Sequence, residues 1–364
     1  MAIQKIYITN KTGSRRSARD DKNWLKMTLI LVLTLSSCAK TQVQKVDHLR
    51  LGYLLNMTHA VPIVGLETES FTETEGQFFM SGGYLLNALL TNNVDIAYIG
   101  PGPYLNALNK GVKLKLLAVS SIGANSLILA ENYDLKETYV IKKLAVPQLG
   151  NTQDLLAKIL VKKISARNNR VKMFSKEMKD LIDSEKIRIS KKLDYIPVSP
   201  AELEMAFYTK AIDSALVAEP WGTMLESKGL VNLSTHLSFG PRDMVEELDG
   251  AGDNGLKDTL KLINKYPATL LVVKEEFYKV NQARVDTFVI EQNEVLAAIQ
   301  EESNSAVALV KSHLENKTKK SFGEAFLLSS FSKVKFSDKL DKTRLQELAN
   351  IAREVKYFRK DLIL

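Results

Sequence analysis

Two stretches of this chain resemble each other at a fixed separation of 118 residues, and this internal repeat constrains the fold more than any other feature. Each copy begins with a serine suited to capping a helix, continues with apolar residues at helical spacing, and ends in a short apolar run. Each copy therefore predicts a helix, a turn and a buried strand. In the second copy Pro200 suits the first helical position and Glu202 the third position of a capping box. The identical pairs are Ser81 and Ser199, Leu85 and Leu203, Ala88 and Ala206, Thr91 and Thr209, Asp95 and Asp213, and Ala97 and Ala215.

A matching offset can arise by chance, and the alternative is that the two copies are similar α/β units. Two such units predict two lobes with a ligand cleft between them. In both copies the predicted strand runs into a Gly/Pro-rich turn, at residues 100–103 and 219–222. Ligands bind beyond the carboxyl ends of strands in open parallel sheets, so these two turns form the first candidate site.

The first 38 residues have the layout of an export signal. A basic segment is followed from Met27 by a nine-residue apolar run, two serines and Cys38, the only cysteine. The run is too short to span a membrane, so residues 1–37 are predicted to be a signal peptide. Residues 38–46 are polar and suit a short tether. A cysteine directly after such a segment can be the site of lipid attachment in an exported protein. The alternative is an exported protein in which Cys38 is incidental or buried.

Composition describes an ordinary globular body. The chain has 364 residues, of which 45% are hydrophobic and 25% charged, enough for two domains. Its net charge is +8, but removing residues 1–37 lowers this to about +3. A nucleic-acid partner is therefore not expected. A single cysteine excludes an internal disulfide framework.

Strands alternate with helices along the body, which predicts a parallel α/β sheet. Lobe 1 is expected from residues 47–122 and 263–364, with C-terminal helices packed on it, and lobe 2 from residues 123–262. Residues 56–60 and 148–150 are predicted strand-end loops. The second loop enters a helix capped by Asn151, with Asp154 in its first turn.

Four stretches resemble periplasmic substrate-binding proteins of ABC importers, in the nitrate, sulfonate and taurine group. They are LGYLLNMTHA (51–60), the block at 81–103, PQLGNTQD (147–154) and IDSALVAEPWGT (212–223), and they span most of the body. The resemblance implies the two-lobed periplasmic-binding-protein fold of type II with a two-strand hinge. It also implies a small-molecule ligand, a lipoprotein at the membrane surface, and permease and ATPase partners. The lipobox resemblance of residues 35–38 makes Cys38 the expected lipidation site.

The family's ligand contacts come from the same loops, and the resemblance carries them over by motif. Ser120 and Ser121 are added because they lie at a predicted strand end. The ligand-binding residues expected from the resemblance are Thr58, His59, Gly100, Pro101, Gly102, Gln148, Asn151, Thr152, Gln153, Glu219 and Trp221.

The charges of these candidates leave the ligand open. His59 is the one candidate that can carry positive charge, and only partly near neutral pH. An anion would then rest on backbone N–H groups at helix N-termini. Asp154 or Glu219 could receive an amine, as in taurine, although a first-turn helix carboxylate and a hinge hydrogen bond are the respective alternatives. Trp221 is expected either in the cleft wall or in the core.

An enzyme is the rival class, because thiamine-pyrimidine synthases and menaquinone-pathway enzymes share this fold. The sequence lacks the cysteine-rich motif of the former, and its four histidines form no evident triad or metal cluster. No cofactor, metal or catalytic residue is therefore expected. A binding protein for a thiamine-pyrimidine precursor and a tethered ligand sensor remain as alternatives.

Overall fold

A computed structural model describes residues 44–130, 138–171, 187–236, 256–339 and 341–364. Residues 45–364 form one compact unit. The predicted signal peptide, Cys38 and most of the tether lie outside the described residues. The division of the body into lobes stays a prediction, and the described strands form two sheets.

The first sheet has six strands in the order β11-β4-β10-β3-β1-β2. Strand β1 pairs in parallel with β2 and β3, whereas β10 runs antiparallel to β3 and β4. Its strands are β1 (Leu49–Leu54), β2 (Thr74–Phe79), β3 (Ile96–Ile99), β4 (Leu114–Gly123), β10 (Pro267–Lys274) and β11 (Val334–Phe336).

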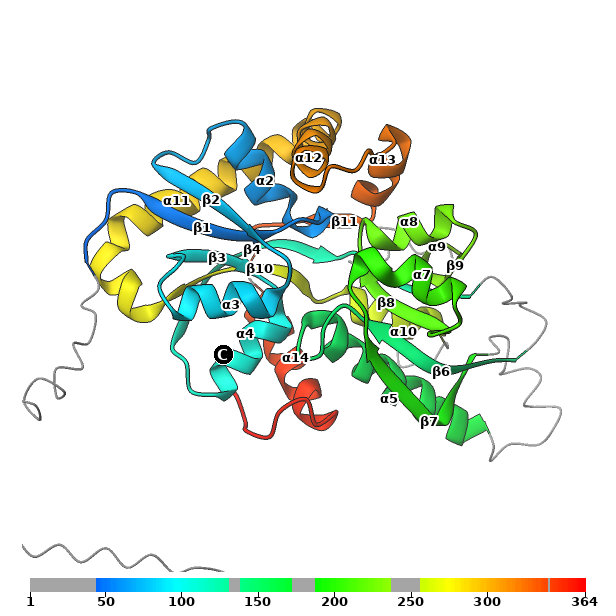
Figure 1. The fold of residues 1–364 in the computed structure, drawn as a ribbon. Helices are drawn as coiled ribbons and strands as arrows, with labels where there is room; N and C mark the ends of the chain where they lie inside the picture. Colours follow the sequence, from blue (N-terminus) through cyan, green and yellow to red (C-terminus); the bar gives the residue numbers. More distant parts are fainter. Residues whose placement is uncertain (1–43, 131–137, 172–186, 237–255, 340) are drawn as a thin grey trace, which may run out of the picture. The chain divides into compact units, whose positions relative to one another are not determined.

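The second sheet has five strands in the order β7-β6-β8-β5-β9. Strand β6 is parallel to β7 and β8, and β5 is antiparallel to β8. Both sheets are therefore mixed, so the expectation of a wholly parallel sheet is wrong (Figure 1). The antiparallel pairs arise at β4, β5 and β10. The strands are β5 (Asn125–Leu129), β6 (Tyr139–Val146), β7 (Ile187–Pro197), β8 (Ser214–Ala218) and β9 (Val231–Asn232).

Helices connect the strands and cover the sheets. Those before β10 are η1 (Met57–His59), α2 (Ala60–Glu67), α3 (Gly82–Leu90), α4 (Pro101–Asn109), α5 (Thr152–Val171), η2 (Pro200–Glu202), α7 (Leu203–Tyr208), α8 (Trp221–Ser227), α9 (Leu233–His236) and α10 (Leu256–Asn264). Those after it are α11 (Glu275–Glu301), α12 (Ser303–Thr318), α13 (Glu324–Ser332) and α14 (Lys342–Glu354).

The chain crosses between the sheets at two adjacent places. Strand β4 ends at Gly123 and β5 begins at Asn125, and the chain returns through residues 264–267. The buried Asn264 side chain pins the crossings together: its Oδ1 accepts from the Asn125 backbone N at 2.8 Å, and its Nδ2 donates to the Asn125 carbonyl at 3.0 Å. The first bond satisfies a buried backbone N–H, and the second adds to the bond that the Asn125 carbonyl accepts from the Ser234 hydroxyl.

The internal repeat is real in three dimensions. Each copy forms a helix, a turn and a strand, as α3 with β3 and α7 with β8. The helices end at the equivalent Thr91 and Thr209, whose hydroxyls donate to the carbonyl four residues earlier at 2.8 and 2.9 Å. The next residues, Asn92 and Lys210, both adopt positive φ, 62° and 58°. The two copies therefore share the predicted local structure.

Equivalent aspartates start the two repeat strands. The Asp95 carboxylate accepts from the Arg50 backbone N of β1 at 2.9 Å, and the Asp213 carboxylate accepts from the Lys143 backbone N of β6 at 3.1 Å. Each aspartate thus ties the amino end of its strand to the parallel neighbour.

The helix starts of the two copies differ. Ser81 caps α3 by accepting from the Tyr84 backbone N at 3.4 Å. Ser199 makes no such cap: Pro200 begins a 3₁₀ turn, and the Ser199 hydroxyl donates to the Glu202 carboxylate at 2.6 Å. The predicted capping box is therefore wrong, because the side chain that should have received the backbone N–H binds the glutamate instead.

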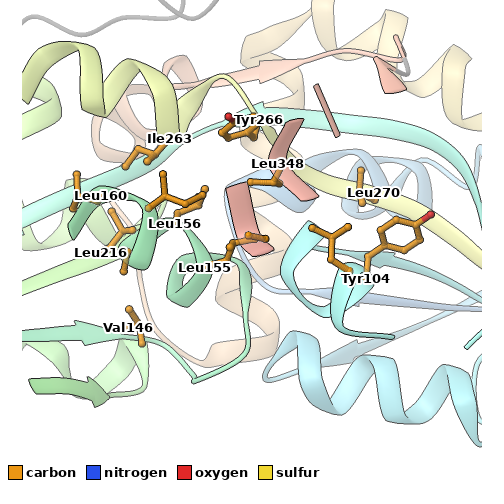
Figure 2. Packing of buried hydrophobic residues seen from close by; sticks show 14 of the residues in the cluster. Tyr104, Val146, Leu155, Leu156, Leu160, Leu216, Ile263, Tyr266, Leu270 and Leu348 are labelled. Carbon is orange, nitrogen blue, oxygen red and sulfur yellow. The ribbon is translucent and has the colours of Figure 1, made fainter. Parts of the chain in front are cut away.

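One hydrophobic cluster includes side chains from both sheets and from α14. Figure 2 shows Leu155, Leu156 and Leu160 of α5 with Ile263 of α10 and Leu348 of α14. Each fully buried leucine contributes about 1.5–3 kcal/mol. Helices α11 and α12 contact α2 of the first sheet, whereas α14 contacts α5. We expected all the C-terminal helices to pack on the first lobe. The contact of α14 with α5 shows that this helix also packs elsewhere.

Candidate functional site

The first group of predicted site residues lies at the carboxyl end of β1. Asn56 caps η1 through a bond from the Thr58 backbone N at 3.0 Å. The Ser121 hydroxyl donates to the Thr58 carbonyl at 2.8 Å, and the Thr269 hydroxyl donates to Thr58 Oγ1 at 3.1 Å. Thr58 and Ser121 are buried. The fold therefore brings Thr58 and Ser121 together, although 63 positions separate them.

His59 is buried beside this group and is uncharged. Its Nδ1 accepts from the Leu54 backbone N at 3.3 Å. Burial lowers the pKa of His59 from 6.5 to about 3, because desolvation penalises the imidazolium form. The expectation of a partly cationic His59 is wrong, and an anion at this place would have to be held by neutral donors.

Ser120 precedes Ser121 on β4. Its side chain is fully buried, and its hydroxyl has no hydrogen-bond partner within the described ranges. Buried hydroxyls are almost always paired, so this one is a neutral donor not used by the described residues. The next residue of β4, Ser121, differs from Ser120 because its hydroxyl donates to the Thr58 carbonyl.

The second group joins α4 to the start of α5. Gly100 is the N-cap of α4, and Pro101 is at its first position, so the predicted Gly/Pro turn is the first turn of a helix. The Gly102 backbone N donates to Thr152 Oγ1 at 3.2 Å. A Cβ on Gly102 would lie 2.5 Å from the Asn151 carbonyl carbon. Only glycine permits this approach of the two backbones.

The loop before α5 is fixed by its own side chains. Asn151 Oδ1 accepts from the Asp154 backbone N at 2.8 Å, which confirms the predicted helix cap. The Asp154 carboxylate accepts from the Gly150 backbone N at 2.9 Å and pairs with Lys158. Asp154 thus has the structural role of a first-turn carboxylate rather than a free acceptor for an amine.

Gln148 and Gln153 lie on either side of this loop and contact different parts of the protein. A Cβ on Gly83 of α3 would lie 3.1 Å from the Gln148 side-chain oxygen, so Gln148 reaches toward the first repeat helix. Gln153 Nε2 donates to Asn125 Oδ1 at 3.1 Å, at the crossing between the sheets. The loop therefore contacts both α3 and the crossing.

The third group surrounds Glu219 at the end of β8. Glu219 is fully buried, and its carboxylate accepts from the Ser126 hydroxyl at 2.8 Å and from the Thr223 backbone N at 3.0 Å. Its carbonyl accepts from the Met57 backbone N at 3.1 Å, across the two sheets.

Trp221 begins α8 and is half-buried. Its ring packs against a hydrophobic cluster of the second sheet that includes Leu203 and Leu225. The side chain is thus neither a fully buried core residue nor an exposed wall, and one part of the ring remains accessible.

Two contributors escaped the sequence analysis, and both come from the C-terminal segment. Lys333 Nζ donates to Thr223 Oγ1 at 2.8 Å and lies 3.5 Å from Glu219 Oε1. The Tyr357 hydroxyl donates to the Gly150 carbonyl at 2.5 Å and accepts from Asn106 Nδ2 at 2.9 Å. No local sequence signal marks either residue, because their partners lie more than 100 positions away.

Neither a metal cluster nor a membrane span is found in the part of the chain that the structure describes. No three His, Cys, Asp or Glu side chains there are grouped so as to hold an ion. None of the described helices combines the length and apolar character needed to cross a bilayer.

Comparison with solved structures identifies the fold. A ligand-binding component of an ABC-type import system from Staphylococcus aureus, solved with zinc bound, has a TM-score of 0.61 and 16% identity, covering 86% of this chain and 93% of that one. The alkanesulfonate-binding protein SsuA from Xanthomonas axonopodis, bound to MOPS, has a TM-score of 0.59 and 15% identity. That match covers 87% of this chain and 96% of SsuA. The nitrate-binding protein NrtA from Synechocystis has a TM-score of 0.59 and 14% identity, and the match covers 86% of this chain and 83% of NrtA. The chain has the two-sheet α/β fold of periplasmic binding proteins.

Sequence comparison agrees with this fold. The chain is 24% identical over 227 residues to proteins from Brucella abortus and Brucella suis, each named only as a provisional binding protein. The match covers 60% of this chain and 63% of each relative, less than two thirds of the relatives' length. The model of the NMT1-like family matches residues 42–311, which is most of the chain, and the chain therefore belongs to the NMT1-like family.

Proposed function

We propose that this protein is the solute-binding component of an ABC importer, capturing a small molecule and delivering it to a membrane permease and its ATPase. The observation that carries the proposal is the meeting of strand-end loops from two sheets, with Thr58 and Ser121 on one and Thr152 and Glu219 on the other. Ligand sites in open α/β sheets lie at such carboxyl strand ends. The similar solved structures are ligand-binding proteins by name, which favours binding over catalysis.

The proposed ligand carries a small oxyanion group, as nitrate, alkanesulfonates and taurine do. Neutral donors dominate the candidate site: His59 is uncharged, the Ser120 hydroxyl has no partner among the described residues, and α5 begins there. The first turn of α4 adds no such donor, because Pro101 and Pro103 lack an N–H and that of Gly102 is donated to Thr152. Backbone N–H groups at helix N-termini bind anion oxygens without a side-chain cation. Two similar structures are named for binding alkanesulfonate and nitrate, which supports the same chemical class here.

A thermal-shift screen of residues 45–364 tests this function. The panel is nitrate, bicarbonate, ethanesulfonate, taurine and a pyrimidine, each at up to about 10 mM. A ligand at about 100 times its Kd should add about 2.7 kcal/mol of stability and raise Tm by roughly 5 °C. A rise with ethanesulfonate, taurine or nitrate supports the proposed class. A rise with the pyrimidine alone would favour the precursor-binding alternative, and no rise with any compound would contradict the proposal.

We also propose that the chain is exported and anchored as a lipoprotein through Cys38, with residues 47–122 and 263–364 forming one lobe and 123–262 the other. The basic segment, the apolar run from Met27 and the serines before Cys38 support the anchor.

Replacing Cys38 with alanine should leave the protein unprocessed or released, because acyl chains supply the membrane affinity. Cell fractionation that finds this variant still processed and membrane-bound would refute the anchor. Ser37→Ala is the matched control and should fractionate as wild type.

A further inference from the structure

Lys333 joins the end of α13 to the turn that follows β8. The side chain is 18% exposed, and its ammonium contacts three oxygens of the second-sheet segment. These are Thr223 Oγ1 at 2.8 Å, Glu226 Oε2 at 3.3 Å and Glu219 Oε1 at 3.5 Å. The first two contacts are hydrogen bonds, and the contact with Glu219 is an ion pair.

The charge of Lys333 compensates a carboxylate that has no access to water. Glu219 is 0% exposed, and its other partners, the Ser126 hydroxyl and the Thr223 backbone N, are neutral. A buried carboxylate without a nearby cation is strongly destabilised. Lys333 therefore favours the arrangement in which the Glu219 turn lies against α13, and its loss would favour separation of the two.

The same lysine is covalently tied to the first sheet. Residue 333 directly precedes β11, which pairs with β4 through Phe336 and Ser121. The backbone N of Ser337 also donates to the Ser120 carbonyl at 3.3 Å. Helices α13 and α8 contact each other, and Figure 1 shows them as neighbours. Lys333 thus links the strand that carries Ser120 and Ser121 to the turn that carries Glu219 and Trp221.

We propose that Lys333 is a positioning residue of the ligand site: through Glu219 and Thr223 it holds the 219–223 turn against the first sheet in the arrangement that binds ligand. The inference rests on the proposed function, and it deepens that function by naming what sets the site's geometry. The contacts of its ammonium that carry this role are all with residues 219–226, so its effect passes through the turn. If Lys333 is lost and the competent arrangement falls to about a tenth of the population, the apparent Kd rises about tenfold.

The test compares Lys333→Met, Lys333→Arg and Lys335→Met in residues 45–364. Lys335 is the matched control, because it lies two residues along on β11 and loses the same charge without touching the Glu219 turn. The probes are ethanesulfonate, taurine and nitrate, titrated by calorimetry at a temperature where urea melts show each variant folded. Acrylamide quenching of Trp221, the single tryptophan of residues 45–364, reports the turn without any ligand.

Lys333→Met is expected to weaken binding of the best probe about tenfold and to increase quenching of ligand-free Trp221. Lys333→Arg should restore most of the affinity, since it retains the cation, and Lys335→Met should match wild type. Equal affinity in Lys333→Met and wild type would overturn the proposal. A purely structural lysine would instead lower the free energy of unfolding while leaving both the Kd of the folded protein and the quenching unchanged.

Failure of the proposed function gives a different pattern. If wild type binds none of the three probes, the oxyanion-binding proposal fails, and quenching alone decides the role of Lys333. Greater quenching of Trp221 in Lys333→Met than in Lys335→Met would then support the positioning role. Equal quenching in the two variants would refute it. Should Lys333→Met not fold, Thr223→Val replaces it, because this change removes the 2.8 Å contact at constant side-chain shape and has the same expected outcomes.

Discussion

Replacing Gly102 with alanine should weaken ligand binding by about 100-fold, or about 2.7 kcal/mol. The new Cβ would lie 2.5 Å from the Asn151 carbonyl carbon and 2.6 Å from the Thr152 backbone N. These are backbone atoms and cannot rotate away, so α4 and the start of α5 must separate. The bond from the Gly102 backbone N to Thr152 Oγ1 would then be lost. Overpacking of this kind also costs about 1–3 kcal/mol of folding stability.

Calorimetry with the best compound of the ligand panel measures the first effect, and urea unfolding the second. Gly323→Ala is the matched control, since its Cβ would meet only the Cβ of Phe326, at an ordinary contact distance of 3.9 Å. Gly323 precedes α13 with φ of −64°, which alanine adopts without strain. Gly323→Ala should therefore keep its affinity. Unchanged affinity and stability in Gly102→Ala would show that the approach of α4 to α5 is not part of the site.

Lowering the pH from about 7.5 to about 5.0 should destabilise wild type by about 2 kcal/mol more than His59→Asn. In the folded protein burial holds the pKa of His59 at about 3, whereas an accessible histidine has a pKa of 6.5. Below pH 6.5 the unfolded chain therefore binds a proton that the folded protein does not, and stability falls as the pH drops through the window from 6.5 to about 3. The interval of about 1.5 pH units between 6.5 and 5.0 corresponds to about 2 kcal/mol.

Urea unfolding at both pH values measures this difference. In His59→Asn the amide oxygen can take the place of Nδ1 as acceptor for the Leu54 backbone N, and it does not titrate. The control is His48→Asn, the same change at an exposed histidine beside Glu73, which should keep the wild-type pH dependence. If wild type and His59→Asn lose equal stability, then His59 is not buried in its neutral form.

The sequence predicted the elements whose signals are local. The apolar runs at β1, β3 and β8, the Ser81 cap and the Asn151 cap all lie where the pattern placed them. What failed depends on partners that the pattern does not specify. Strand direction in β10 is set by its neighbours β3 and β4, and the Ser199 hydroxyl is diverted to the Glu202 side chain. Periodicity carries no information about either choice.

For the candidate site, strand-end reasoning found groups that the fold does bring together. Thr58 meets Ser121, and Gly102 meets Thr152, as expected for loops at the carboxyl ends of strands. Charge was harder to predict, because burial changes it: removal of His59 from water lowers its pKa and suppresses the partial positive charge that an accessible histidine would carry. Lys333 was invisible, since nothing near it in sequence shows that it faces Glu219. Cys38 lies outside the described residues and stays a prediction.

The central claim is that two α/β lobes close on a small oxyanion. Contacts between the strand-end loops, such as Gly102 with Thr152 and Met57 with Glu219, should then be stabilised by a ligand that touches both sides. Small-angle scattering of residues 45–364, with and without the panel compound that raises Tm most, measures this directly. The account predicts a smaller radius of gyration with the compound bound. An unchanged radius at saturation, with binding proven by calorimetry, would contradict it and indicate a rigid pocket.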